Sequence, residues 1–374
     1  MKNNTAKQNI PSGWKEKSLE NFLLISKGKL PKKTYEVADE NSVPYLSIKH
    51  LDGAEYKYAH KSDGVIADKN DLLVIADGSG SGRMYRGYHG LVSSTFLKIS
   101  SQSPSEISND YLEVLFSHLD FTKSRFRKGG AIPHFDFKQL KDVDILVPPI
   151  KEQKKIAEIL GTVNEDITKT QEVIEATEKL KRGLMQQLFT RGIRNAEFKV
   201  SRLGNLCIFQ TGKLNSNRAV DGGKYPFFTC SQETFAIDQY SFDQKAILLA
   251  GNNAAGKYSV KYYNGKFDAY QRTYVISIKN EDLLSYPYLK EVLNTRLNEL
   301  RDSSVGSTTK FLTLKLLESL PISLPPISEQ REIAEILSAI DEKILVNKKI
   351  KNNLTLLKKG LMQGLLSGLV RVKV

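Results

Sequence analysis

The sequence predicts an α+β fold, in which two mixed α/β domains are separated by a pair of long antiparallel coiled-coil helices. Two observations support this prediction. One segment of about 40 residues occurs twice and has the apolar spacing of a long helix. Each copy follows a stretch in which short strand-like runs alternate with glycine-rich loops. The duplication gives the chain an internal pseudo-twofold repeat.

The repeat is most visible where each helix is expected to begin. Residues 148–160 read "PPIKEQKKIAEIL" and residues 325–337 read "PPISEQREIAEIL". Residues 148–188 align on 325–365 without a gap, and 19 of the 41 positions are identical. The same offset of 177 residues continues backwards, for example from Tyr111 to Tyr288. Solenoid repeats span 20–50 residues, so this longer period indicates a duplicated domain.

Each repeated segment is expected to form one long helix. The two prolines disfavour a helix immediately before them, and the first turn carries an acid, Glu152 or Glu329, which suits the helix dipole. Apolar residues then recur every three or four positions, which is typical of a coiled coil. An ordinary surface helix is the alternative. The residues expected to form the helix-pair or partner interface are Ile156, Leu160, Val163, Ile167, Leu180, Leu184, Leu188, Ile333, Leu337, Ile340, Ile344, Leu357, Leu361 and Leu365.

The predicted domain limits follow from these segments. We assign residues 1–147 to a first globular domain, 148–192 to a first repeat helix, 193–324 to a second globular domain and 325–374 to a second repeat helix. The globular parts share an order of elements. Two strands (71–76 and 94–99, or 246–250 and 272–278) precede a helix (110–127, or 288–301), and a glycine-containing loop leads to a last strand. Antiparallel packing of ~60 Å helices would relate the two domains by a pseudo-twofold axis, which matches two half-sites on a DNA duplex.

Composition favours a polyanionic partner in a reducing compartment. Lys and Arg number 55 against 42 Asp and Glu, which gives a net charge of +13; nucleic acid is the first candidate partner and an acidic membrane surface the second. The two cysteines have no metal-ligand spacing, so neither a zinc site nor a disulfide framework is expected. The start lacks an apolar signal core, and no 18-residue apolar run occurs. We therefore expect a cytoplasmic protein without a membrane partner.

Catalytic motifs are not evident. All five histidines precede residue 135, so the two halves cannot share a histidine-based mechanism. We find no S-adenosylmethionine glycine motif, base-methylation motif, helicase motif or nuclease motif. "GNNAAGKY" (251–258) has the G-x-x-x-x-G-K spacing of a phosphate-binding loop, but Tyr258 stands where Ser or Thr would ligate magnesium. A nucleotide-binding enzyme therefore stays open as an alternative, beside a simple glycine-rich turn and a loop that contacts DNA.

Several motifs together resemble one known family. The start "IPSGWKEKSLENF", the two "PPI-x-EQ-x-x-IA-x-IL" segments and the endings "KRGLMQQL" and "KKGLMQGL" resemble the specificity (S) subunit of type I restriction–modification systems, over nearly the whole chain. The resemblance implies a non-catalytic DNA-binding subunit with two target-recognition domains, each reading half of a bipartite site on double-stranded DNA. The helices would fix the unread spacer.

The same resemblance implies the partners. The helices would dock two methyltransferase (M) subunits, and motor-nuclease (R) subunits would join the full complex, an adenine-specific DNA methyltransferase and endonuclease. No cofactor or metal is expected in this chain, whereas S-adenosylmethionine is expected in the partner methyltransferase subunits. A DNA-specificity subunit of a related type II system, with a fused methyltransferase–nuclease, is the alternative.

The candidate DNA contacts are polar and aromatic residues in the glycine-containing loops. Arg and Asn can read base edges with two hydrogen bonds, and scattered Lys and Arg can hold phosphates. In the first domain the candidates are Arg83, Tyr85, Arg86, Arg127, Lys128 and His134; in the second they are Asn252, Asn253, Lys257, Tyr258, Ser307, Thr308, Thr309 and Lys310.

Overall fold

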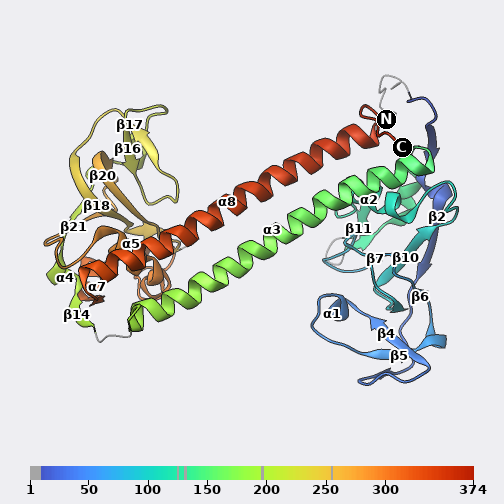
Figure 1. Ribbon diagram of the computed structural model, residues 1–374, viewed down its shortest axis with the longest axis horizontal. Coiled ribbons are helices and arrows are strands. Elements are labelled where there is room, and N and C mark those ends of the chain that lie inside the picture. The colour runs from blue at the N-terminus through green and yellow to red at the C-terminus, as the bar shows by residue number, and fades with distance from the viewer. Residues whose placement is uncertain (1–9, 124–125, 130–132, 195–197, 254–255) are drawn as a thin grey trace. The chain divides into compact units, whose positions relative to one another are not determined.

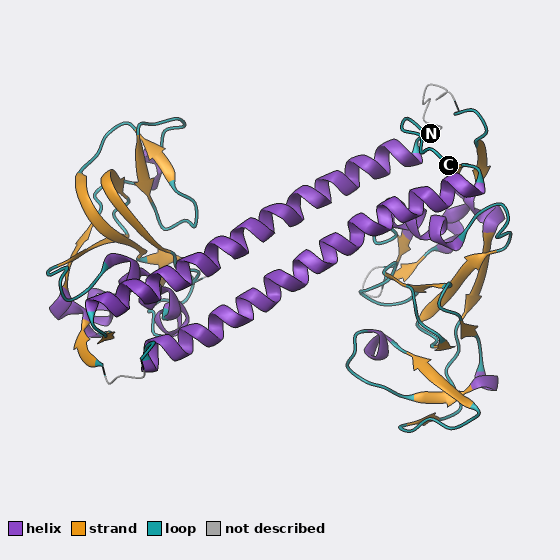
Figure 2. Cartoon of the chain, viewed as in Figure 1, coloured by secondary structure: helices purple, strands orange, loops and turns teal. Residues whose placement is uncertain are grey.

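The chain divides into two compact units in a computed structural model. The structure describes residues 10–123, 126–129, 133–194, 198–253 and 256–374. Unit 1 comprises Met1–Lys169 with Ile350–Val374, and unit 2 comprises Thr170–Lys349. Both units combine strands, short helices and segments of two long helices (Figures 1 and 2). This mixed content confirms the predicted α+β class.

The two long helices are the repeated segments. Helix α3 spans Ile150–Arg191 and α8 spans Ile327–Leu366, each as one continuous helix (Figure 1). Both begin directly after the proline pair, as proline sterics require. Helix α8 ends before residue 374, because Gly368 has a φ of +72° that a helix does not allow. Each compact unit takes a segment of both helices, whereas our predicted domain limits keep the helices separate; those limits stay predictions.

Unit 1 is built on two sheets. Its four-stranded sheet has the order β2-β10-β7-β8 (Leu23–Lys27, Phe96–Ser101, Leu72–Ile75, Met84–Tyr85). Its five-stranded sheet has the order β3-β5-β4-β9-β6 (Thr34–Tyr35, Tyr58–His60, Ser42–Leu46, Gly90–Val92, Ile66–Ala67), with α1 (Ile48–Leu51) after β4. The pairs β1-β13 (Lys15–Ser18, Asp144–Val147) and β11-β12 (Arg127–Lys128, His134–Phe135), with α2 (Asn109–Leu119), complete the elements that position the site.

Unit 2 has one larger sheet, ordered β15-β21-β18-β20-β16-β17 (Cys207–Thr211, Thr273–Ile278, Phe242–Ala250, Val260–Ala269, Tyr225–Phe228, Phe235–Ile237). Two short pairs accompany it, β14-β23 (Lys199–Arg202, Pro321–Leu324) and β19-β22 (Asn252–Asn253, Lys310–Phe311). The helices are α4 (Leu203–Leu206), α5 (Tyr286–Thr295), α6 (Leu297–Asp302) and α7 (Leu314–Ser319). The four strands predicted by sequence therefore occur as β7, β10, β18 and β21.

The two helices predicted before the last loop are shorter than expected. Helix α2 stops at Leu119 and not at residue 127, because Asp120 adopts the left-handed conformation (φ 52°). Aspartate tolerates this conformation better than most residues, and it turns the chain so that Phe121 packs against Phe116 with ring centroids 4.6 Å apart. The second predicted helix is divided into α5 and α6 at Arg296.

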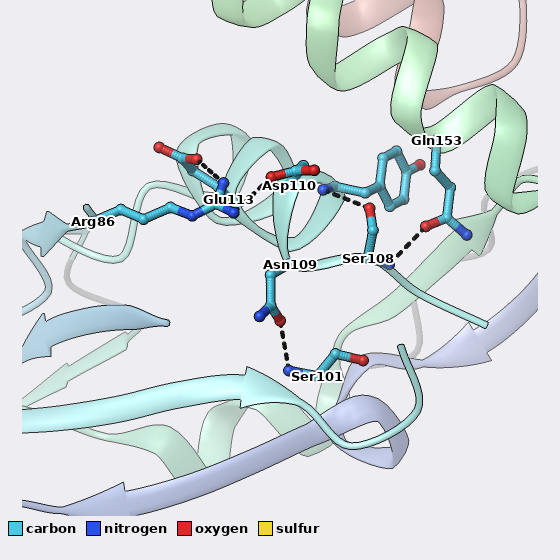
Figure 3. Close-up of polar contacts among 8 residues, drawn as sticks. Arg86, Ser101, Ser108, Asn109, Asp110, Glu113 and Gln153 are labelled. Atoms are coloured by element: carbon cyan, nitrogen blue, oxygen red, sulfur yellow. Dashed lines mark hydrogen bonds and ion pairs between the residues drawn. The ribbon is translucent and has the colours of Figure 1, made fainter. Parts of the chain in front are cut away.

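The repeated "EQ" pair anchors each long helix to its globular part. The Gln153 side chain is fully buried and accepts a hydrogen bond from the Ser108 backbone N–H (3.0 Å; Figure 3). It also donates to the carbonyls of Glu106 (2.6 Å) and Pro148 (2.9 Å). Gln330 makes the same three bonds with Ser285, Leu283 and Pro325, each 177 residues further along the chain. The duplication seen in the sequence is therefore also a duplication of buried contacts.

The long helices are antiparallel within each unit. In unit 1 the Arg371 guanidinium, just beyond α8, lies 2.6 Å from the Glu152 carboxylate, while Lys358 donates to Asn164 (2.7 Å). In unit 2 Lys348 pairs with Glu178 (2.8 Å) and Lys181 with Asp341 (2.6 Å). In both units, later residues of α3 therefore contact earlier residues of α8. The two helices run in opposite directions, which confirms the predicted antiparallel packing.

The predicted apolar stripe is only partly buried. Ile156, Leu160 and Leu365 belong to the core of unit 1, and Leu188, Ile333 and Leu337 to the core of unit 2, so these residues pack against globular parts as well as against the helix pair. Ile344 is buried too, whereas Val163, Ile167, Leu184, Ile340 and Leu361 are half-buried. The equivalent residues Leu180 and Leu357 are 57% and 50% exposed, so the chain itself leaves them uncovered.

Candidate nucleic-acid interface

In unit 1 the two predicted loops meet at one edge of the four-stranded sheet. Strands β2 and β7 run parallel on either side of β10, so both end where β10 begins. At this edge Asp77, just after β7, forms a β-bridge with His134, and the Gly78 N–H donates to the carbonyl of Pro133 (2.9 Å). We call the loops gathered here, residues 77–87 and 126–129 with 133–136, the loop edge of unit 1.

Unit 2 repeats this arrangement. Strands β15 and β18 flank β21 and end where it begins. Strand β19, directly after β18, pairs with β22, and the Leu312 N–H donates to the carbonyl of Gly251 (2.8 Å). We call residues 251–253, 256–258 and 305–311 the loop edge of unit 2. In both units the fold thus brings together two loops that lie at least 39 residues apart in the sequence.

Asp77 pairs with two basic side chains at the loop edge of unit 1. Its carboxylate lies 2.7 Å from the His134 ring and 3.2 Å from the Lys27 ammonium. Partial burial opposes ionisation of Asp77, but the hydrogen bonds from His134 and Lys27 outweigh burial, so its pKa is lowered. Arg83 is exposed and its guanidinium stacks over the Tyr85 ring at 5.6 Å. Lys128 is also exposed, 3.5 Å from Asp136.

Among the predicted DNA contacts, Arg86 and Arg127 bind other parts of the protein and Tyr258 is buried. Arg86 binds Asp110 (2.6 Å) and Glu113 (2.7 Å) on α2, so it braces the loop against this helix (Figure 3). Burial works against the charge of Arg86, but the bonds to these carboxylates outweigh burial and raise its pKa. Arg127 donates to the Ser81 hydroxyl (2.9 Å) and the Ser79 carbonyl (3.0 Å), and so holds the glycine-rich loop in place. Tyr258 is 3% exposed, in the core of unit 2.

The other candidates of unit 2 lie around the β19-β22 pair. Lys257 is exposed, and its backbone N–H donates to the Asn253 side chain (3.2 Å). Ser307 and Thr308 are exposed, whereas Asn252, Asn253, Thr309 and Lys310 are half-buried. Residues 254–255 of the phosphate-loop-like segment lie outside the described residues. Because the Tyr258 side chain is buried, it offers no exposed oxygen for a magnesium ion.

Sequence reasoning missed two basic residues at these edges. Lys27 ends β2 in unit 1, and exposed Arg272 precedes β21 in unit 2, with its guanidinium 5.5 Å from the Phe311 ring. A usable signal was the shared "GKL" at 28–30 and 212–214. A Cβ atom at Gly28 or Gly212 would collide with the backbone oxygen of Ser93 or Ala269, so both positions mark a close approach of two segments at the sheet edge.

Metal and membrane sites are not found in the described part of the chain. No group of three or more His, Cys, Asp or Glu side chains there could hold a metal ion. None of the described helices combines the length and apolarity that crossing a bilayer requires. The polar and basic residues of the two loop edges are therefore the candidate ligand-binding groups.

Two stretches of the chain, residues 11–178 and 195–356, match the same family model, described as the type I restriction modification DNA specificity domain. The chain belongs to this family. The two matches also coincide with the internal repeat: each contains one loop edge together with most of one long helix.

Relatives and solved structures agree with this assignment. The chain is 29% identical over 408 residues to the type I restriction enzyme MjaVIII specificity subunit of Methanocaldococcus jannaschii, covering 97% of this chain and 94% of that protein. It is 39% identical over 144 residues to the type I restriction enzyme EcoDI specificity subunit of Escherichia coli, and this alignment covers 31% of that protein. A crystal structure of a type I restriction–modification S subunit from M. genitalium has the same fold (TM-score 0.69, 17% identity, 97% and 98% of the two chains).

Proposed function

We propose that this chain is the DNA-specificity subunit of a type I restriction–modification complex, and that each unit reads one half of a bipartite site through its loop edge. The observation that carries the proposal is the duplicated loop edge in a chain that matches the specificity-domain family twice. Arg83 and Lys128 in unit 1, and Asn252 and Lys257 in unit 2, would contact bases or phosphates. Methylation mapping of the host genome with and without this gene tests the proposal, with loss of one split adenine motif expected.

The long helices have two proposed roles. Helices α3 and α8 pass unbroken from one unit to the other, which supports a role in fixing the length of the unread spacer. Exposed Leu180 and Leu357 support a second role, the docking of two methyltransferase subunits, because apolar side chains at equivalent positions suit two equivalent partners. The motor-nuclease subunits would then join the assembled complex. We propose that this subunit is itself non-catalytic and that S-adenosylmethionine is bound by the methyltransferase subunits.

The type II alternative has less support. Every relative and solved structure named above is a type I protein. A nucleotide-binding enzyme is also disfavoured, because buried Tyr258 stands at the position of the magnesium ligand. Purified chain that hydrolysed ATP at a robust rate would contradict this interpretation.

Lys257→Ala is expected to weaken DNA binding and to lower the slope of log K against log salt by about one, because one phosphate contact releases about one counterion. The matched control is Arg86→Ala, which removes a cation that α2 already neutralises, and the salt slope should not change. Both slopes are measured by titrating the assembled methyltransferase complex with labelled DNA at several salt concentrations. An unaltered slope for Lys257→Ala would remove this residue from the interface.

The alkylation rate of Cys230 can report whether DNA binds at the loop edge of unit 2. The half-exposed Cys230 thiol lies 3.4 Å from the carbonyl of Arg272, at the start of β21. Buried Cys207 is the internal control, because burial raises the pKa of its thiol to about 12 and keeps it protonated at pH 8. DNA bound at this edge should slow alkylation of Cys230, while Cys207 stays unreactive with and without DNA. Mass spectrometry after brief alkylation gives both rates; equal Cys230 rates would contradict binding there.

A further inference from the structure

Unit 1 contains a cavity that holds a lysine without a carboxylate partner. The cavity has a volume of about 360 Å³ and lies between α2, α3 and α8. Its walls include the apolar side chains Val114, Leu160 and Met362 and the polar pair Asn164 and Lys358. All of these residues belong to unit 1.

Lys358 is the charged group that this cavity leaves without a counterion. Its side chain is half-buried, and its ammonium donates a 2.7 Å hydrogen bond to the neutral amide oxygen of Asn164. No ion pair among the described residues includes Lys358. Burial lowers its pKa, although the more distant charge of Glu113 opposes this effect. A half-buried ammonium has lost part of its hydration, so a carboxylate partner would stabilise it.

In unit 2 the equivalent lysine pairs with two carboxylates. Lys181 of unit 2 is the equivalent of Lys358, and its ammonium lies 2.6 Å from Asp341 and 3.6 Å from Glu291. The positions equivalent to these two acids are Asn164 and Val114, each 177 residues earlier. Unit 1 therefore keeps the lysine but lacks both carboxylates.

The acids around the cavity do not replace the missing pair. Asp110 and Glu113 both bind the Arg86 guanidinium, at 2.6 and 2.7 Å, and Glu158 binds Lys155 at 2.9 Å. Asp110 and Glu113 therefore share one cation and Glu158 has another, so none of the three forms an ion pair with Lys358. The cavity has room for one further acidic side chain beside Lys358.

We propose that this cavity receives a glutamate or aspartate side chain of a docking protein partner, which pairs with the Lys358 ammonium. The proposal rests on the proposed function, since the partner it addresses is the methyltransferase subunit. The apolar walls would cover the methylene stem of the incoming side chain, and Asn164 would retain its bond to Lys358. A DNA phosphate fits less well, because the apolar side chains Val114, Leu160 and Met362 in the walls suit a carboxylate on a methylene stem and not a phosphodiester.

Asn164→Asp tests the proposal with a nearly isosteric change. It supplies the internal carboxylate that Asp341 supplies in unit 2, so the chain should fold with unchanged or higher thermal stability. The affinity for the purified methyltransferase subunit of the same system should fall about tenfold at one of its two binding steps, because the site is already neutralised. Lys358→Met should cause a similar loss. Isothermal titration calorimetry measures both steps.

Asn353→Asp is the matched control, because it adds the same charge at an exposed position of α8 and should leave the affinity nearly unchanged. Unaltered affinity in both Asn164→Asp and Lys358→Met would overturn the cavity proposal alone. Equal losses in Asn164→Asp and Asn353→Asp would also overturn it, since general repulsion would then explain the effect. If the parent chain did not bind the methyltransferase subunit at all, the proposed assembly would fail, and the cavity proposal with it.

Discussion

Replacing residues 1–147 with the matching segment of a relative should change one half of the methylated motif completely and leave the other half unaltered. The physical reason is that the loop edge of unit 1 lies wholly within these residues, whereas the loop edge of unit 2 is formed by residues 251–253, 256–258 and 305–311. Methylation mapping of DNA modified by the assembled complex reads the two halves separately. The reciprocal exchange of residues 193–324 should change only the other half.

The exchange has to preserve the contacts by which the globular part holds α3. The Trp14 indole N–H donates to Glu152 (2.9 Å), and Ser108 donates its backbone N–H to Gln153 (3.0 Å). A donor segment that carries Trp at the position of Trp14 and a non-proline residue at the position of Ser108 should therefore dock on the unchanged helix. Trp14→Phe in the parent chain is the control: it removes one docking bond but no loop residue, so the motif should not change. If the exchange altered both halves, or neither, the division of reading between the units would be wrong.

The sequence was most informative where two copies could be compared. The repeated "PPI-x-EQ" segments predicted where α3 and α8 begin, because proline geometry and the first-turn acid act locally. The buried hydrogen bonds of Gln153 and Gln330 could not be predicted, since their partners lie 45 to 47 residues away along the chain and at the adjoining proline. Helix α2 was predicted too long because the left-handed Asp120 leaves no pattern in apolar spacing.

The candidate interface also has features that the local sequence could not predict. Composition identified loops rich in Arg, Lys and Asn, and the fold brings them together in pairs. Which of these cations face solvent depends on partners elsewhere in the chain. Arg83 and Arg86 are three residues apart in one loop, yet Arg83 is exposed and Arg86 is held by two acids of α2. The position of those acids relative to the loop is a tertiary property, so no local motif distinguishes the two arginines.

Gln153→Ala is expected to lower the free energy of unfolding by roughly 3 kcal/mol, which is large for one polar side chain. Its amide satisfies one buried N–H and two carbonyls, and each buried group left without a partner costs about 1–3 kcal/mol, partly offset where water enters. Gln330→Ala should cause a similar loss, since its three bonds have lengths between 2.8 and 3.0 Å. Urea unfolding followed by circular dichroism measures both losses.

Two further variants separate the hydrogen bonds from the volume of the Gln153 side chain. Gln153→Glu keeps the shape and the acceptor for Ser108, but at neutral pH it turns a carboxylate oxygen toward the carbonyls of Glu106 and Pro148. It should therefore be at least as unstable as Gln153→Ala, although it fills the same space. Exposed Gln186→Ala, on the same helix, should change stability by less than about 0.5 kcal/mol. If Gln153→Glu were as stable as the parent chain, the two donated bonds would not hold the helix, and the identical residue in both repeats would need another explanation.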